Sequence, residues 1–135
     1  MSEANVELVR RGAAAYKARD WARLREFYDP DVVMHHLEGW PEPGPSVGRE
    51  AVIREFQLLS DSFAVETAEI TEIVGRGDRV VARYRWRGKG RGPDTEMEFS
   101  FVFTIRDGKC VREEHFWDHA RALEAAGLST AGPKR

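Results

Sequence analysis

The sequence predicts an α+β domain in which three helices precede a sheet of long strands. In the first 63 residues, apolar side chains recur three or four positions apart, which is the period of a helix buried on one side. From about residue 65 onward, apolar and polar residues alternate, as in a strand with one buried face. Short glycine-containing turns separate the alternating runs, so neighbouring strands should be antiparallel.

Three amphipathic helices are expected before residue 64. The first covers residues 3–18, the second begins at the N-cap Asp20, and the third opens at Ser46 or Gly48. Their buried stripes are Val6, Val9, Ala13 and Tyr16; Trp21, Leu24, Phe27 and Tyr28; and Val52, Phe56, Leu59 and Phe63.

The segment between the second and third helices has little regular structure. Pro30, between two aspartates, should end the second helix, because proline breaks a helix. A short strand is expected over residues 32–36. Residues 40–45 contain three prolines and should form an irregular loop.

Four strands should follow the third helix, and the pairing of two of them can be derived. After a strand at residues 65–74, residues 79–88 alternate most regularly, and residues 95–105 alternate in the same way. One register places Arg87 beside Glu96 and Arg85 beside Glu98 on the outer face. The same register places Trp86 beside Met97 and Tyr84 beside Phe99 on the inner face. The row Arg79, Arg83, Arg85 and Arg87 could bind an anion or form salt bridges across the strands, and we expect salt bridges.

The last hairpin decides which way a histidine points. Val111, Glu113, His115 and Trp117 share one face of the strand that follows it. A two-residue Asp-Gly turn would expose His115. A three-residue loop with Gly108 in the left-handed conformation would instead pair His115 with Phe99 and Trp117 with Met97. We predict the three-residue loop, because it keeps the strand's large apolar residues on the buried side.

A short helix should close the fold after Asp118, over residues 119–126, with Gly127 as its C-cap. We expect one domain over residues 1–128 and a flexible tail over residues 129–135.

Composition excludes several classes of function. The chain has 135 residues, of which 41% are hydrophobic and 33% charged, so one core can be buried and its outside solvated. The net charge of -2 offers no basic excess for nucleic acid. Cys110 is the lone cysteine, which fits a reducing cytoplasm. The N-terminus lacks an apolar run for a signal or membrane span, so we expect a cytoplasmic protein without a membrane partner.

Three stretches resemble SnoaL-like proteins of the nuclear transport factor 2-like and ketosteroid isomerase-like superfamily. They are FYDPDVVMHH at residues 27–36, GREAVIREF at residues 48–56, and RDGKCVREEHFWDHARALEAAGL at residues 106–128. The resemblance covers about residues 3–128. It implies a cone-shaped fold, in which a curved, mostly antiparallel sheet wraps around the three helices, and it implies a homodimer. It does not choose a reaction, because this fold hosts isomerases, cyclases, hydrolases, dehydratases and non-enzymes.

The catalytic positions of the related enzymes are occupied in this chain mainly by apolar residues and by two histidines, His36 and His115. Where the ketosteroid isomerases keep their general base, this chain has His36; the matches to their tyrosine and acid fall at Gly12 and at Phe99 or Phe101. The water-holding residues of the limonene epoxide hydrolases match Met34, His36 and His115, while their arginine and aspartate match Tyr84 and Trp86. Neither catalytic set is present.

The inner face should line a pocket for a small apolar molecule. We expect its wall to contain Tyr84, Trp86, Phe99, Phe101, His115 and Trp117, with Met34 and His36 from the first strand. His36 and His115 could be catalytic acids and bases, or buried histidines satisfied by a hydroxyl or water. Glu113 could orient His115 or reach the edge and be solvated, and we expect the solvated position. His119 should lie at the rim or in solvent.

Neither a metal nor another cofactor is expected, since the histidines form no HxH or HExxH motif. The leading interpretation is a small-molecule pocket, with cofactor-independent isomerisation, cyclisation, dehydration or hydrolysis of a polyketide-like or terpenoid-like compound if it is an enzyme. A ligand carrier or sensor without turnover is the rival. A third is a homodimeric interaction module that pairs through the outer sheet face, which carries Val102 and Phe116.

Overall fold

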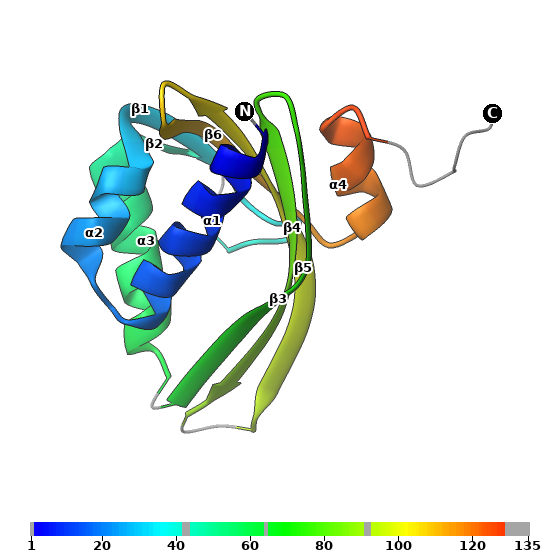
Figure 1. Cartoon of the computed structure of the whole chain (residues 1–135). Coiled ribbons are helices and arrows are strands. Elements are labelled where there is room, and N and C mark those ends of the chain that lie inside the picture. Colours follow the sequence, from blue (N-terminus) through cyan, green and yellow to red (C-terminus); the bar gives the residue numbers. More distant parts are fainter. Residues whose placement is uncertain (1, 42–43, 64, 91–92, 129–135) are drawn as a thin grey trace.

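The computed structural model describes residues 2–41, 44–63, 65–90 and 93–128, which form one sheet and four helices. Helices α1 (Ser2–Lys17), α2 (Trp21–Phe27) and α3 (Arg49–Asp61) lie on the concave side of the sheet, and α4 (His119–Ala125) lies on its convex side (Figure 1). The predicted α+β class, with three helices before the long strands and one after them, is confirmed. The expected tail, residues 129–135, lies outside the described residues.

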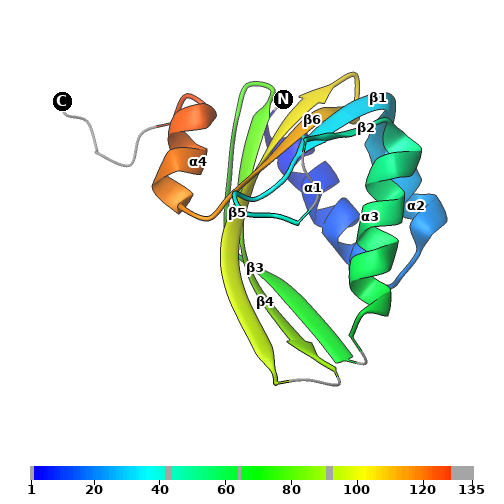
Figure 2. The ribbon, with the colours of Figure 1, turned by 180° about the vertical axis from the view of Figure 1, so that it is seen from behind.

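The sheet has six strands and is antiparallel except at one seam. The strands are β1 (Tyr28–His35), β2 (Ser46–Val47), β3 (Val65–Arg76), β4 (Arg79–Lys89), β5 (Thr95–Arg106) and β6 (Lys109–Phe116). They lie in the order β2-β1-β6-β5-β4-β3, and β1 runs parallel to β6. The view from behind shows the long strands curving around α1 and α3 (Figure 2). The interior of this half-cone is where a ligand could be enclosed.

The junction of α2 and β1 differs from the sequence prediction. Asp20 caps α2 as expected, accepting a hydrogen bond from the Arg23 backbone N–H at 3.1 Å. However, the helix ends at Phe27, so Tyr28 is the first residue of β1, where it pairs with Cys110 of β6. The pairing is then irregular up to Val33, across the segment that contains Pro30, because proline has no N–H for the ladder.

The predicted register of β4 and β5 is confirmed. Arg87 pairs with Glu96 and Arg85 with Glu98, while Trp86 pairs with Met97 and Tyr84 with Phe99 inside. The outer guanidinium groups are occupied as expected: Arg87 Nε lies 2.6 Å from Glu96, and both Arg83 and Arg85 contact Glu98. The row is therefore a salt-bridged face, and an anion would have to compete with these carboxylates.

The last hairpin contradicts the predicted loop but keeps the predicted face. Arg106 pairs with Lys109, so the turn has two residues, and Asp107 (φ 52°) and Gly108 (φ 76°) both adopt left-handed backbone. A bulge next to Cys110 then shifts the register by one residue, so His115 pairs with Phe101 and not with Phe99. Because of this shift, His115 lies on the inner side of the sheet. The two-residue turn without the bulge would have placed it on the outer side.

Trp117 was predicted in the inner wall opposite Met97, and this position is wrong. Strand β6 ends at Phe116, because Asp118 caps α4 and the chain turns over the sheet. The Trp117 side chain is 47% exposed, and its indole N–H donates to the Glu38 carbonyl at 2.9 Å.

Helix α4 covers the apolar part of the convex face. Its buried residues Ala122 and Leu123 pack with Val81 and Val102 of the sheet, and Phe116 packs against the same cluster. Val102 is 0% exposed, so this residue does not contribute to the outer dimer surface that we expected, while Phe116 is only partly buried. A homodimer through the outer sheet face stays a prediction. None of the helices in the described residues is long and apolar enough to cross a membrane.

The burial of Cys110 predicts a loss of stability at alkaline pH. Burial, with the Glu113 charge as the second cause, raises the pKa of its thiol well above the ordinary value of 9.0. Above pH 9 the unfolded chain loses a proton that the folded chain keeps. The free energy of unfolding should then fall by about 1.4 kcal/mol per pH unit. Urea unfolding between pH 9 and pH 10 should show this fall, to which the tyrosines add, because burial raises the pKa of Tyr28 and Tyr84 above the ordinary value of 10.0 as well.

Cys110→Ala should make that slope smaller in the same pH interval and leave the part that the tyrosines cause, whatever it does to stability at pH 7. Equal slopes for the variant and the wild type would contradict this explanation.

Candidate functional site

A cavity of about 270 Å³ lies between the three N-terminal helices and the concave face of the sheet. Its wall contains five of the residues predicted to bind a ligand: Tyr84, Trp86, Phe99, Phe101 and Glu113. Most of the remaining wall is apolar and comes from α1, α2 and α3. Trp117 does not line it. The cavity therefore has the composition of a small-molecule site, with an apolar wall and few polar groups.

Among the described residues, Glu113 is the one carboxylate in this wall, and it is 0% exposed. Its Oε1 accepts a hydrogen bond from the Tyr28 hydroxyl at 2.6 Å, and its Oε2 lies 2.6 Å from Nε2 of His115. The expectation that Glu113 is solvated is wrong. Strand β6 lies between β1 and β5, so Glu113 pairs with Met34 on one side and Phe103 on the other, far from any open edge.

The partners of Glu113 indicate which atoms carry protons. Burial, and then the Glu113 charge, raises the pKa of Tyr28 well above its ordinary range, so the phenol stays protonated and donates. The short contact to Tyr28 is typical of a hydroxyl that donates to a carboxylate. An ionised carboxylate only accepts hydrogen bonds, so Nε2–H of His115 would be the donor in its contact with Oε2. His115 also stacks on Phe101, with ring centroids 3.6 Å apart, so its orientation is fixed.

Tyr84 supplies a second polar group to the same wall. Burial, and then the Glu113 charge, raises the pKa of its phenol, so it also stays protonated. None of the hydrogen bonds among the described residues involves the Tyr84 hydroxyl, although its side chain is only 9% exposed. An O–H donor in an apolar cavity, beside a carboxylate and without a protein acceptor, suits a polar atom of a ligand.

The two predicted catalytic histidines meet at a smaller cavity of about 50 Å³. His36 and His115 both line it, together with Met34, and their ring centroids are 6.4 Å apart. Nε2 of His36 lies 3.0 Å from the Ser46 hydroxyl and 3.9 Å from Glu55. The two cavities share the side chains of Phe56, Leu59, Trp86, Phe99 and Phe101 as a common wall. The histidines are therefore close together, as expected, but beside the main cavity.

The family model of the SnoaL-like domain matches residues 9–113 of this chain. The chain belongs to this family. The expected resemblance to SnoaL-like proteins is thereby confirmed, and solved structures named as nuclear transport factor 2-like proteins or as a candidate ketosteroid isomerase share the fold.

Three solved structures illustrate the similarity. Bal32a, from a soil-derived mobile gene cassette, is 24% identical, with a TM-score of 0.80 over 93% of this chain and 97% of its own. TerC, co-crystallised with polyporic acid, is 26% identical, with a TM-score of 0.74 over 91% and 97% of the two chains. A Sinorhizobium meliloti protein named as a candidate polyketide cyclase is 26% identical, with a TM-score of 0.68 over 81% and 93%. A search of curated proteins found no match.

Sequence reasoning missed the polar contacts of Tyr28, Tyr16 and Glu66 in this SnoaL-like domain. Tyr28 was assigned to the apolar stripe of α2. Tyr16, assigned to the stripe of α1, donates its hydroxyl to Glu66 of β3, and the indole N–H of Trp86 donates to the same carboxylate oxygen. The signal that could have found them is chemical: a tyrosine in an apolar stripe needs a partner for its hydroxyl.

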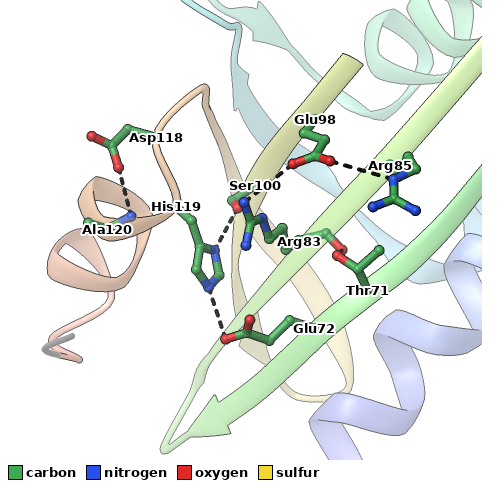
Figure 3. A network of polar contacts seen from close by, with 9 residues as sticks. All are labelled: Thr71, Glu72, Arg83, Arg85, Glu98, Ser100, Asp118, His119 and Ala120. Atoms are coloured by element: carbon green, nitrogen blue, oxygen red, sulfur yellow. Dashed lines mark hydrogen bonds and ion pairs between the residues drawn. The ribbon is translucent and has the colours of Figure 1, made fainter. Parts of the chain in front are cut away.

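A separate polar network lies on the convex face of the SnoaL-like domain, outside both cavities (Figure 3). Nδ1 of His119 lies 2.7 Å from the Ser100 hydroxyl, and its Nε2 lies 3.2 Å from Glu72. The set resembles a serine–histidine–acid triad, but Ser100 is buried beneath α4 and, unlike Glu113, lines neither of the two cavities. His119 was expected at the rim or in solvent. Instead, it is the first residue of α4, and its contacts with Ser100 and Glu72 connect this helix to the sheet. No group of three metal-ligating side chains occurs among the described residues.

Removing the Tyr28 hydroxyl should destabilise the fold. Tyr28→Phe leaves one oxygen of the buried Glu113 carboxylate without its donor, which should cost about 1–3 kcal/mol. Tyr84→Phe is the matched control, because the Tyr84 hydroxyl has no protein partner in the described residues. It should cost less than about 0.5 kcal/mol. Urea unfolding at pH 7 measures both changes, and equal losses would contradict the role of Tyr28.

Proposed function

We propose that this chain binds a small, largely apolar carbonyl compound in the main cavity and moves a proton at the carbon next to the carbonyl group. One observation carries the proposal: a buried carboxylate, Glu113, and an uncommitted phenol, Tyr84, share the wall of an apolar cavity. Such a pair supplies a base and an electrophilic donor in a site of low dielectric constant. The chemistry requires no cofactor.

The proton transfer assigns one role to each group. The C–H bond of the ligand breaks, its proton passes to the Glu113 carboxylate, and the electron pair forms an enolate. The carbonyl oxygen, which gains the negative charge, accepts a hydrogen bond from the Tyr84 hydroxyl. Return of the proton to another carbon gives an isomer. Attack of the enolate carbon on a second carbonyl group of the same molecule forms a C–C bond and an alkoxide, which takes the proton back from Glu113 to give a cyclised alcohol.

The histidines act around this centre. His115 is a positioning residue, since its Nε2 contacts Glu113 and its ring is held on Phe101. His36 faces it at the smaller cavity, whose volume of about 50 Å³ exceeds the ~10–15 Å³ that one water needs. A proton can thus be exchanged between the two rings through a molecule held there. His36 is a second acid or base in this proposal.

The similar proteins support a site of this kind. TerC was co-crystallised with polyporic acid, and two of the similar structures are named as candidate polyketide cyclases. The cavity volume lies just below the range of about 300–1,000 Å³ typical of ligand pockets, which favours a compact molecule.

Ligand binding without turnover is the second candidate. One observation favours it: both oxygens of Glu113 already have partners, and a purely structural buried carboxylate needs no more than that. In that case the chain is a carrier or sensor with the same pocket. A homodimer and a cytoplasmic location remain predictions for either function.

Exchange of carbon-bound hydrogen distinguishes the two candidates without the natural substrate. 2-Indanone, a compact bicyclic ketone, should lose its α-protons to D2O faster in the presence of the protein, as followed by proton NMR. Glu113→Gln keeps the shape and one acceptor but removes the base, so the protein-dependent rate should fall about 100-fold or more. Glu114→Gln, one residue away and on the opposite face of β6, is the matched control and should keep the rate.

Tyr84→Phe should lower the same rate about 100-fold while 2-indanone still binds. A Glu113→Gln protein that exchanges as fast as the wild type would exclude Glu113 as the base. Binding of the ketone by the wild type without any exchange would favour the carrier.

A further inference from the structure

The main cavity has two cationic side chains at its mouth. Arg10 and Lys17, both exposed on α1, belong to its lining, and the residues between them on that helix include Gly12, Ala13 and Ala14. Positions seven apart lie two turns apart on one face, about 10 Å along the axis. The small residues leave the opening clear between the two long side chains.

These two charges are not neutralised within the described part of the chain. No ion pair or hydrogen bond there involves the side chain of Arg10 or Lys17. Neighbouring arginines differ: Arg11 on the same helix pairs with Glu7 at 3.9 Å, and Arg19, in the turn after it, donates to the Ser60 carbonyl at 3.1 Å. On β4, Arg83, Arg85 and Arg87 pair with glutamates across the strands. Free positive charge is thus present where the cavity opens, in a chain whose net charge is -2.

The interior has the opposite polarity. Glu113 is the only acidic residue of the cavity wall in the described chain, and it is fully buried. A cleft with apolar walls and a cationic rim concentrates anions at its entrance. The buried carboxylate repels a second negative charge from the interior. An amphipathic anion is therefore oriented in one way only, with its apolar part inside and its charge at α1.

We propose that the molecule bound in this cavity is an organic acid whose carboxylate lies between Arg10 and Lys17. This inference rests on the proposed pocket and adds the substrate class: a compact apolar body that bears the reactive carbonyl, with a carboxylate at the opposite end. The carboxylate of the ligand contacts the two flexible cations and fixes the orientation of the ligand. The apolar body of the ligand contacts the aromatic wall, and the cavity limits its size.

Two probes of the same shape test the inference. 2-Naphthoate and 2-naphthamide share one ring system and differ chiefly in charge, and calorimetric titration at low ionic strength gives both dissociation constants. We expect the wild type to bind the acid about tenfold more tightly than the amide, and added salt to shrink this difference by screening. Arg10→Gln with Lys17→Gln should bring the acid to the affinity of the amide and leave the amide unchanged.

Arg11→Gln is the matched control, because it removes an exposed arginine of the same helix that is paired with Glu7 and lies outside the main cavity. It should keep the preference for the acid. Equal affinities of the wild type for acid and amide, or equal effects of the double variant and Arg11→Gln, would overturn the inference while leaving the pocket intact. Failure of the wild type to bind either probe would count against both the inference and the proposed pocket.

Discussion

The site depends on one buried interaction, the contact of the Glu113 carboxylate with Tyr28 and His115. A carboxylate without exposed surface costs several kcal/mol of lost hydration unless its oxygens are satisfied. Here a phenol held protonated by burial donates to one oxygen, and an imidazole stacked on Phe101 contacts the other. Removing either partner would leave a buried charge incompletely paired. The three residues come from β1 and β6, so the interaction also joins these two parallel strands.

The pairing of β1 with β6 explains how the Glu113 carboxylate reaches the interior. Strand β6 lies between β1 and β5, which places Glu113 at the middle of the sheet and not at an edge. The bulge after the last turn then sets which side of β6 faces inward. Without the bulge, Glu113 and His115 would point to the convex face, where α4 and the salt-bridged arginines lie. Fold and site are thus coupled through a single inserted residue.

Much of the fold follows from local patterns in the sequence. The register of β4 and β5 could be derived, because aromatic residues and opposite charges at positions such as Trp86 and Arg87 agree on one alignment. The turn and bulge of the last hairpin could not, since a bulge carries no distinctive residue pattern. The prediction reached the correct face of His115 through the wrong loop. The expected contribution of Val102 to a dimer surface was wrong for a similar reason: nothing in the sequence states where α4 docks.

The candidate site was predicted in part. Alternation identified Tyr84, Trp86, Phe99 and Phe101 as wall residues, because a curved sheet has one concave face. It misjudged Glu113, since glutamates are rarely buried and the general tendency favours solvent. It could not find Tyr28 or Tyr16, whose partners lie far away in the chain. Whether a polar group is buried depends on the tertiary structure. A single sequence indicates it only where a hydrogen-bonding partner for that group can be recognised.

The most direct test of the central claim is the proton NMR signal of the His115 ring N–H. If Nε2–H donates to a buried carboxylate at 2.6 Å, this proton should resonate strongly downfield and exchange slowly with water. The signal should be absent in His115→Gln, present in His119→Gln, and shifted when 2-indanone enters the cavity. A His115 N–H that exchanges rapidly with water and does not respond to the ketone would contradict the account.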